Sequence, residues 1–345
     1  MTEPTPLTIA VLGVGRIGSM HAELLQFQVA GATVASVYDV HAESAAVVAD
    51  RVGCRASDSV EAIMGDDAID AVAICTSTDT HVALMVAAAE AGKAIFCEKP
   101  ISLSLAEVDR GLAAVAEAGV PLHIGFNRRF DPGHAAVRDA VVHGTVGDLR
   151  QVRITSRDPA PPPISYVEVS GGIFNDMTIH DFDMARFVTG SDVTRVYAQG
   201  AVTVDPAIGE AGDLDTVSVM LTHADGTITT IDNCRQAAYG YDQRVEAFGS
   251  GGMATSENHA DHYTVVRTAA GGHSAPVPHF FLERYVPSYL AQWEAFTAAV
   301  AAGEPTPVSG VDGRAPLVIG LAARRSVDEG RPVTIAEVEA AAHPD

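Results

Sequence analysis

Short apolar runs alternate with amphipathic stretches over the first 126 residues. The runs that have the length and the Val, Ile and Ala content of buried strands are residues 7–12, 33–38, 71–76, 94–97 and 121–126. The stretches between them with helical spacing of apolar positions are residues 19–28, 42–51, 59–64, 81–91 and 105–118. This alternation predicts an α/β domain, residues 1–126, built on a doubly wound parallel sheet.

The pattern changes after Phe126. Strand-like runs follow one another with few helices between them, at residues 149–157, 194–204, 215–222, 226–233, 244–249 and near 274–278. Helices are expected at residues 132–143, 285–302 and 314–329. We therefore predict a second domain, residues 127–345, of α+β class, with a large and mostly antiparallel sheet that has helices on one face.

A glycine-rich turn, GVGRIG, directly follows the first strand. Gly13 allows a tight turn, Gly15 allows a pyrophosphate to approach the backbone, and Gly18 allows close helix–strand packing. Asp39 ends the second strand, 21 residues beyond Gly18 (39 − 18), where an acidic residue can bind ribose hydroxyls. A turn without a ligand is the alternative, but the strand, helix and acid together favour a dinucleotide site.

The composition argues against several classes of binding partner. The formal charge of −22 argues against nucleic acid or an anionic membrane surface as a partner. No apolar run is long enough to span a bilayer, and the first residues lack a basic secretory signal. The four cysteines have no metal-like spacing, so we expect no metal site and a reducing, cytoplasmic location.

Two places carry candidate chemistry. Lys99 follows the strand 94–97 at the sheet edge where ligands bind, and its ammonium could stabilise negative charge on a reacting oxygen. Asp176 and His180 are four residues apart in a stretch expected to be helical, so a carboxylate would lie beside an imidazole, as a general base requires. The alternatives are a solvated lysine and an ordinary helix start with a surface histidine.

Four segments in this order, GVGRIGSMHAELL, CEKP, GFNRRFD and GGIFNDMTIHDFDMARF, resemble the Gfo/Idh/MocA oxidoreductases. The resemblance extends from Ile9 to about Val333 and is strongest to the inositol dehydrogenases of the family. It implies that Lys99, Asp176 and His180 form the catalytic group and that NAD is the cofactor. The residues expected to bind NAD are Gly13, Gly15, Arg16, Ile17, Gly18, Asp39, Thr76, Ser77, His81, Glu98, Lys99 and Asn127.

The same resemblance implies a polyol site. Besides the catalytic group, it would be formed by Arg129, Asp158, Tyr239 and Tyr241, although two tyrosines around a glycine are more often packing residues. The expected reaction is NAD-dependent oxidation of a cyclic polyol, myo-inositol to its 2-ketone, in inositol catabolism, by a homotetramer. The alternatives are a related sugar or scyllo-inositol dehydrogenase, or a non-catalytic regulator that binds NAD and sugar.

Overall fold

The computed structural model describes residues 6–260, 262 and 264–342, which form two compact units. Unit 1 comprises Met1–Asn127 and Tyr289–Ala315, and unit 2 comprises Arg128–Ser288 and Pro316–Asp345. The chain first passes from unit 1 to unit 2 between Asn127 and Arg128, one residue after the boundary that the sequence predicted. The segment Tyr289–Ala315, which the prediction included in the second domain, belongs to unit 1 in the structure.

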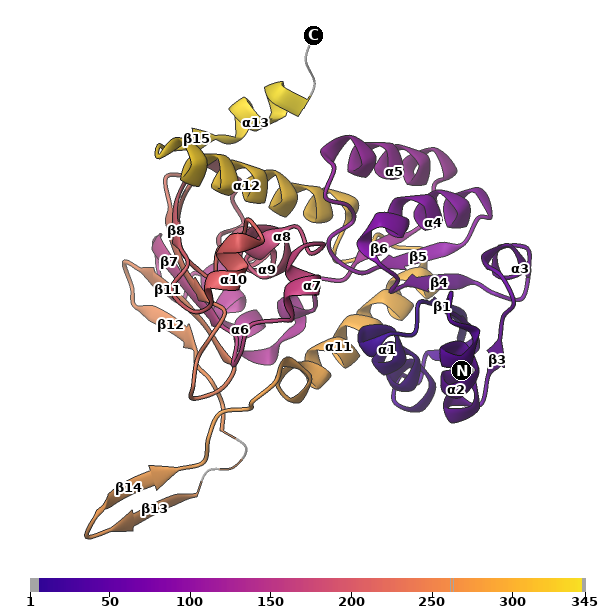
Figure 1. Ribbon diagram of the computed structural model, residues 1–345, viewed down its shortest axis with the longest axis horizontal. Helices are drawn as coiled ribbons and strands as arrows, with labels where there is room; N and C mark the ends of the chain where they lie inside the picture. The colour runs from indigo at the N-terminus through magenta and orange to yellow at the C-terminus, as the bar shows by residue number, and fades with distance from the viewer. Residues whose placement is uncertain (1–5, 261, 263, 343–345) are drawn as a thin grey trace. The chain divides into compact units, whose positions relative to one another are not determined.

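Unit 1 is the predicted doubly wound domain. Its strands are β1 (Leu7–Leu12), β2 (Ala32–Tyr38), β3 (Arg55–Ala56), β4 (Ala71–Ile74), β5 (Ala94–Cys97) and β6 (Leu122–Ile124). They pair in parallel in the order β3-β2-β1-β4-β5-β6, so the order reverses between β1 and β4. The helices are α1 (Arg16–Phe27), α2 (Ala42–Val52), α3 (Val60–Met64), α4 (Thr78–Glu90) and α5 (Leu105–Ala118). Helices α1 and α2 cover one side of this sheet, and α4 and α5 cover the other (Figure 1).

The core of unit 1 explains why a later segment belongs to it. Helix α11 (Phe281–Ala302) begins in unit 2 and continues into unit 1, and helix α12 (Gly310–Glu329) runs from unit 1 into unit 2. Trp293 and Phe296 of α11 are fully buried among side chains of β1, α1 and β5. Helical periodicity shows that a face is apolar but not which sheet it packs against, so the sequence could not assign this helix.

Unit 2 contains the predicted large sheet. Its strands are β7 (Leu149–Arg157), β8 (Val193–Ala201), β9 (Thr216–His223), β10 (Ile228–Cys234), β11 (Asp242–Gly249), β12 (Met253–Ser256) and β15 (Val333–Thr334). They lie in the order β12-β11-β7-β10-β9-β8-β15; the pair β7–β10 is parallel and the others are antiparallel. The sheet is therefore mixed and mostly antiparallel, as predicted.

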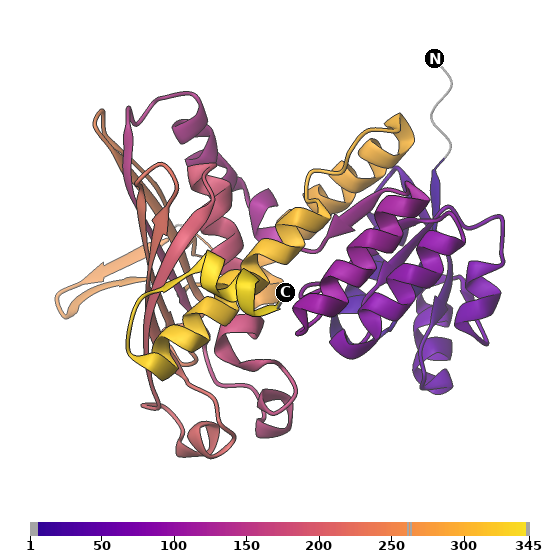
Figure 2. The same ribbon diagram turned by 90° about the horizontal axis from the view of Figure 1, so that it is seen from above.

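Among the described residues, helices cover one face of this sheet, which Figure 2 shows nearly edge-on. They include α6 (Pro132–Val142), which contacts β11 and β12, and α9 (Ile179–Thr189), which contacts β7. The remaining helices that lie wholly in unit 2 are α7 (Ile164–Val167), α8 (Gly172–Asp176), α10 (Pro206–Glu210) and α13 (Ile335–Ala342).

The strand expected near residues 274–278 was misplaced. Strands β13 (Val265–Thr268) and β14 (Gly271–Ser274) form a separate exposed hairpin that extends away from the large sheet (Figure 1). Residues 275–278 follow it without regular structure. Pro276 and Pro278 explain this, since proline cannot donate to a strand ladder.

Candidate active site

The glycine turn in unit 1 has the shape that a dinucleotide requires. Gly13 has φ +84°, and a Cβ there would lie 2.7 Å from the Cys75 carbonyl. A Cβ on Gly18 would lie 1.8 Å from the Gly13 oxygen, so both positions need glycine. A Cβ on Gly15 would meet nothing within 4 Å. Open space therefore lies beside Gly15, where α1 begins, and the residues fit a pyrophosphate at a helix N-terminus.

Asp39 lies against this turn, as its spacing predicted. Its Oδ2 accepts a hydrogen bond from the Val14 N–H at 2.9 Å, and its Oδ1 accepts one from the His41 N–H at 2.9 Å. These bonds fix the carboxylate beside the glycine turn. It has the charge and position to accept hydrogen bonds from a ribose.

Glu98 is held by a chain of buried groups. The indole N–H of Trp293 donates to His21 Nδ1 at 2.8 Å, so Nδ1 is an acceptor and Nε2 carries the hydrogen. Nε2 then donates to Glu98 Oε1 at 2.9 Å, and the Lys99 N–H lies 3.3 Å from Oε2. Sequence reasoning missed the roles of His21 and Trp293, because the two are 272 residues apart.

His81 joins the two loops that carry Thr76 and Lys99. The ring is 1 % exposed, with Nδ1 2.9 Å from the Pro100 carbonyl oxygen and Nε2 3.1 Å from the Thr76 carbonyl oxygen. Burial lowers the pKa of His81, and the neutral ring has one N–H, so it donates to one carbonyl at a time. We interpret His81 as a residue that holds these loops. The peptide bond between Lys99 and Pro100 is cis.

The other cofactor candidates lie in the same unit. Arg16 opens α1 and is exposed, and Ile17 follows it half-buried. Ser77 is the N-cap of α4. Asn127, 2 % exposed, opens a short 3-10 turn, Asn127–Phe130. Their contact with NAD stays a prediction.

Asp176 and His180 do not lie on one continuous helix, contrary to the prediction. Asp176 is the last residue of α8, and α9 begins at Ile179. The N–H groups of Met177 and Thr178 both donate to the Ile173 carbonyl, at 3.0 and 2.9 Å, which loosens the turn between the helices. The spacing of the two side chains is therefore set by this turn as well as by helical periodicity.

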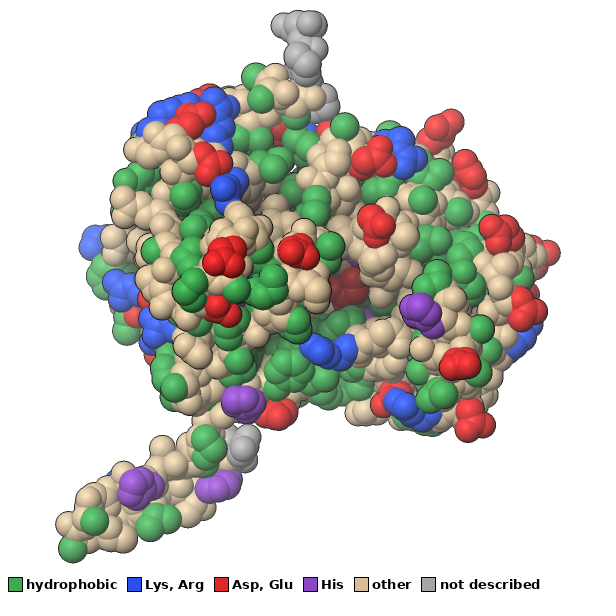
Figure 3. Space-filling model, in the orientation of Figure 1, with side chains coloured by type: hydrophobic (Ala, Val, Ile, Leu, Met, Phe, Trp, Pro, Cys, Tyr) green, Lys and Arg blue, Asp and Glu red, His purple; other side chains and the backbone are tan. Residues whose placement is uncertain are grey.

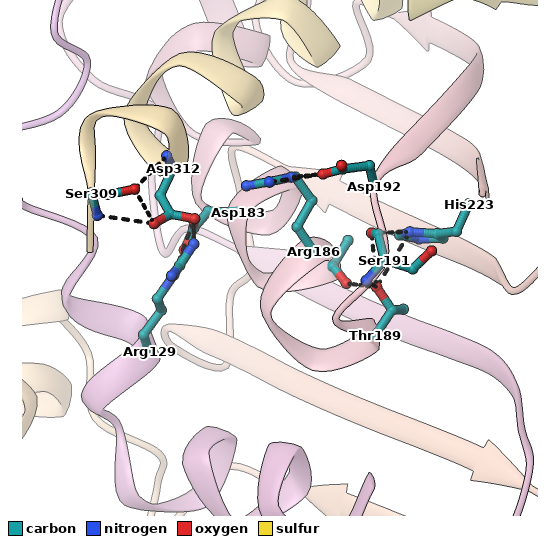
Figure 4. A network of polar contacts seen from close by, with 10 residues as sticks. Arg129, Asp183, Arg186, Thr189, Ser191, Asp192, His223, Ser309 and Asp312 are labelled. Atoms are coloured by element: carbon teal, nitrogen blue, oxygen red, sulfur yellow. Dashed lines mark hydrogen bonds and ion pairs between the residues drawn. The ribbon is translucent and has the colours of Figure 1, made fainter. Parts of the chain in front are cut away.

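The two arginines of the GFNRRFD segment have different partners on α9. Arg128 donates to Asp181 at 2.8 Å and to the Tyr241 hydroxyl at 3.3 Å. Arg129 makes a bidentate contact with Asp183, with distances of 2.6 to 3.1 Å, as Figure 4 shows. Arg128 thus contacts a candidate tyrosine, and the predicted contact of Arg129 with the substrate stays a prediction.

The two candidate tyrosines differ in surroundings. Tyr241 is 6 % exposed beside Arg128, whereas Tyr239 is 53 % exposed and its hydroxyl contacts Asp242 at 2.6 Å and Arg157 at 3.0 Å. Gly240, at φ +121°, separates them, and a Cβ there would lie 2.7 Å from the Val277 side chain. Tyr241 therefore belongs to the buried network of Arg128, and Tyr239 to a more exposed one.

Asp158 directly follows β7, and its N–H donates to the Cys234 carbonyl at 3.0 Å. Burial, together with the nearby negative charge of Asp176, raises the pKa of Asp158 to about 6. The carboxyl group therefore exchanges a proton in the mildly acidic range and can donate or accept a hydrogen bond there.

Metal-ligating clusters and membrane-spanning helices can be considered only for the residues that the structure describes. In that part of the chain, no three His, Cys, Asp or Glu side chains are grouped so that they could hold a metal ion. Likewise, no helix formed by those residues combines the length and apolar character that crossing a bilayer needs. Acidic side chains are scattered over the face of unit 1 seen in Figure 3, without a basic cluster.

Comparisons with known proteins agree with this arrangement. A family model described as an oxidoreductase family with an NAD-binding Rossmann fold, GFO_IDH_MocA, matches residues 7–126, and the GFO/IDH/MocA C-terminal domain matches residues 134–255. The chain belongs to the Gfo/Idh/MocA oxidoreductases. It is an NAD-dependent oxidoreductase, which confirms the predicted family, fold class and cofactor.

Individual relatives cover nearly the whole chain. A myo-inositol 2-dehydrogenase of Thermotoga maritima is 46% identical over 96% of this chain and 99% of its own length. An inositol 2-dehydrogenase of Rhizobium meliloti is 47% identical over 94% and 98%. The solved structure of a Lactobacillus casei scyllo-inositol dehydrogenase with bound NAD(H) and scyllo-inositol has a TM-score of 0.90 and 26% identity, covering 96% and 99%.

Proposed function

We propose that this enzyme is an inositol 2-dehydrogenase that oxidises myo-inositol to the 2-ketone. The observation that carries the proposal is near-full-length identity of 46 and 47% to two relatives that are named for this activity. The resemblance of the sequence motifs to inositol dehydrogenases supports the same activity.

The polar groups of unit 2 suit a ligand made of hydroxyl groups. Arg128 supplies N–H donors, Tyr241 supplies a hydroxyl, and Asp158 supplies a carboxyl group that accepts or donates according to its protonation. Such groups need partners once they are buried, and they disfavour a ligand that lacks matching hydroxyls. We assign them, with Arg129 and Tyr239, to the polyol.

In the proposed mechanism His180 takes the proton of the reacting hydroxyl as general base, and Asp176 supports the imidazolium that forms. Lys99 donates a hydrogen bond to the reacting oxygen and stabilises its partial negative charge. NAD, when bound, supplies the acceptor for the hydride that leaves the same carbon. The glycine turn and Asp39 hold the cofactor, and the alcohol loses one hydride and one proton.

The test is a panel of substrates with the purified protein. Myo-inositol, scyllo-inositol, D-chiro-inositol, glucose and galactose are each incubated with NAD, and formation of reduced nicotinamide is followed by absorbance. We expect the highest kcat/KM with myo-inositol and a C2 ketone as product. A higher value with scyllo-inositol or an aldose would favour the corresponding dehydrogenase. NAD and polyol binding without turnover would favour a regulator.

We expect the enzyme to prefer NAD to NADP because of Asp39. The 2′-phosphate of NADP would meet the carboxylate, and no arginine follows Asp39 until Arg51. Losing a charge-assisted hydrogen bond weakens binding by about 1.5–3 kcal/mol, so Asp39→Ala should lower kcat/KM for NAD by about 10- to 100-fold. The substitution should also reduce the difference between kcat/KM for NAD and kcat/KM for NADP.

The ratio of kcat/KM for NAD and NADP measures this directly. Because both cofactors are tested on the same variant, a general loss of stability cancels in the ratio. Asp39→Asn is the companion variant, since its amide oxygen keeps one acceptor for the Val14 or His41 N–H. A ratio unchanged in both variants would mean that Asp39 does not bind the ribose.

We also propose a homotetramer in the cytoplasm. The face of the large sheet opposite α6 and α9 carries an exposed apolar patch, Phe248 and Met253, on the paired strands β11 and β12. Met220, also exposed, lies further along the sheet on β9. Such a patch favours association with another copy, and the four free cysteines fit a reducing compartment. Sedimentation velocity should give the mass of a tetramer; a monomer at micromolar concentration would contradict the proposal.

A further inference from the structure

The carboxylate of Asp176 is held by two neighbours in unit 2. Arg235, directly after β10, places Nη1 3.1 Å from Asp176 Oδ2. The Tyr166 hydroxyl, on α7, donates to Asp176 Oδ1 at 2.8 Å. Arg235 has only 1 % of its side chain exposed, so water competes little for its guanidinium. The orientation of Asp176 is therefore fixed by groups outside the helices that carry Asp176 and His180.

Asp213 ties the same arginine to the opposite end of α8. Its Oδ2 lies 3.4 Å from Arg235 Nη2, and its Oδ1 accepts the Ile173 N–H at 3.0 Å. Gly172 makes this approach possible: its φ is +77°, and a Cβ there would lie 2.7 Å from Asp213 Oδ1. Asp213 therefore contacts the first turn of α8 at Ile173, and Arg235 contacts its last residue, Asp176.

Carboxylates outnumber the arginine that they surround in this region. Asp158, Asp176 and Asp213 carry three carboxylates, and Arg235 is the guanidinium in contact with two of them. Asp176 raises the pKa of the buried Asp158 carboxyl group and Arg235 opposes that rise. Removal of Arg235 would take away the positive charge that lies between these carboxylates and would raise the pKa of Asp158 further.

The other charged groups around this cluster have partners that the substitution leaves in place. Arg128 also opposes the rise at Asp158, and Asp181 adds to it, but these two are paired with each other at 2.8 Å. Tyr166 contributes a neutral hydroxyl, and His180 follows Asp176 by four residues on α9. Arg235 is therefore a cation in direct contact with Asp176, and its loss changes the charge there.

We propose that Arg235 is a positioning residue of the reaction: it orients Asp176 for His180, supplies the positive charge that pairs with this carboxylate, and is itself anchored by Asp213. This inference rests on the proposed function, because Asp176 and His180 act as a pair in the oxidation. Arg235 does not touch the polyol in this role. It acts through Asp176.

The experiment measures kcat and KM from pH 5.5 to 9 for the full chain, three test variants and one control variant. In Arg235→Gln, kcat should fall about tenfold or more and the acid limb of its pH profile should move up by about one unit, the usual effect of losing a nearby cation. Arg235→Lys keeps the charge but not the two-armed contact, so kcat should fall while the acid limb stays in place. Asp213→Asn should lower kcat and should not raise the acid limb.

Arg186→Gln is the matched control. Arg186, on α9, is also a largely buried arginine paired with an aspartate, Asp192, at 2.8 Å, and the pair is drawn in Figure 4. This variant should keep the parent's pH profile. The dissociation constant for NAD should be unchanged in every variant, which shows that unit 1 is intact.

The outcomes distinguish a failure of the proposed dehydrogenase activity from a failure of the role proposed for Arg235. A parent without turnover on any polyol overturns the proposed function. An active parent whose Arg235→Gln variant keeps both kcat and acid limb overturns the role of Arg235. If Arg235→Gln does not fold, Arg235→Lys decides: parental kcat in that variant overturns the proposal, and a reduced kcat with an unmoved acid limb supports it.

Discussion

Replacing His180 by alanine should lower kcat for polyol oxidation by about 10² to 10⁴, the usual contribution of a general base. The imidazole is the acceptor proposed for the hydroxyl proton, and alanine leaves that proton to water. Binding of NAD should change little, because the cofactor residues lie in unit 1 and His180 lies on α9 of unit 2. Steady-state kinetics with myo-inositol, together with NAD titration, measures both effects.

His143→Ala is the control for this substitution. His143 is an exposed histidine at the end of α6, also in unit 2, and its Nδ1 lies near the Asp139 carbonyl oxygen of its own helix. Turnover should be unaffected there. If His180→Ala retained near-parental kcat at neutral pH, another group would have to be the base.

The dinucleotide unit could be predicted from sequence because its determinants are local. The strand, the glycine turn and the helix are consecutive, and Gly13 and Gly18 are required by backbone contacts within that unit. The distance from Gly18 to Asp39 is fixed by one helix and one strand. The contact between Asp39 and Val14 follows from that topology.

The polar contacts in unit 2 could not be predicted in the same way. Arg128 and Arg129 are adjacent and chemically identical, and only the short 3-10 turn decides that one meets Asp181 and the other Asp183. Sequence spacing contains no information about that rotation. Which of the two arginines binds the polyol therefore stays a prediction.

Long-range partners were missed for a related reason. Arg235 reaches Asp176 across 59 positions, and Trp293 reaches His21 across 272. Periodicity describes one element at a time, whereas these contacts depend on which strand or helix becomes a neighbour. The break between α8 and α9 was hidden too, because Met177 and Thr178 keep helical dihedral angles. Of the two, only the Thr178 N–H departs from the helical pattern, since it donates to Ile173, five residues back.

Replacing Lys99 by methionine should lower kcat by about 10² to 10³, the effect of removing one group that stabilises charge on a reacting oxygen. Methionine keeps the length and the apolar stem, so packing beside Pro100 should be largely retained. The affinity for NAD should fall much less than kcat. A kinetic isotope effect with myo-inositol deuterated at C2 should become larger in the variant, because the chemical step then limits turnover.

Lys93→Met separates this effect from the loss of any lysine in unit 1. Lys93 precedes β5, the strand that leads to Lys99, and its ammonium donates to the carbonyls of Asp66 and Ile69, both at 2.9 Å. Its loss leaves two carbonyls without that donor, so the thermal midpoint should fall while kcat per folded molecule stays at the parental value. Lys99→Met should show the opposite combination, a midpoint near the parent and a low kcat. If Lys99→Met lost only NAD affinity, with full turnover at saturating cofactor, Lys99 would be a cofactor ligand and not a stabiliser of the reacting oxygen.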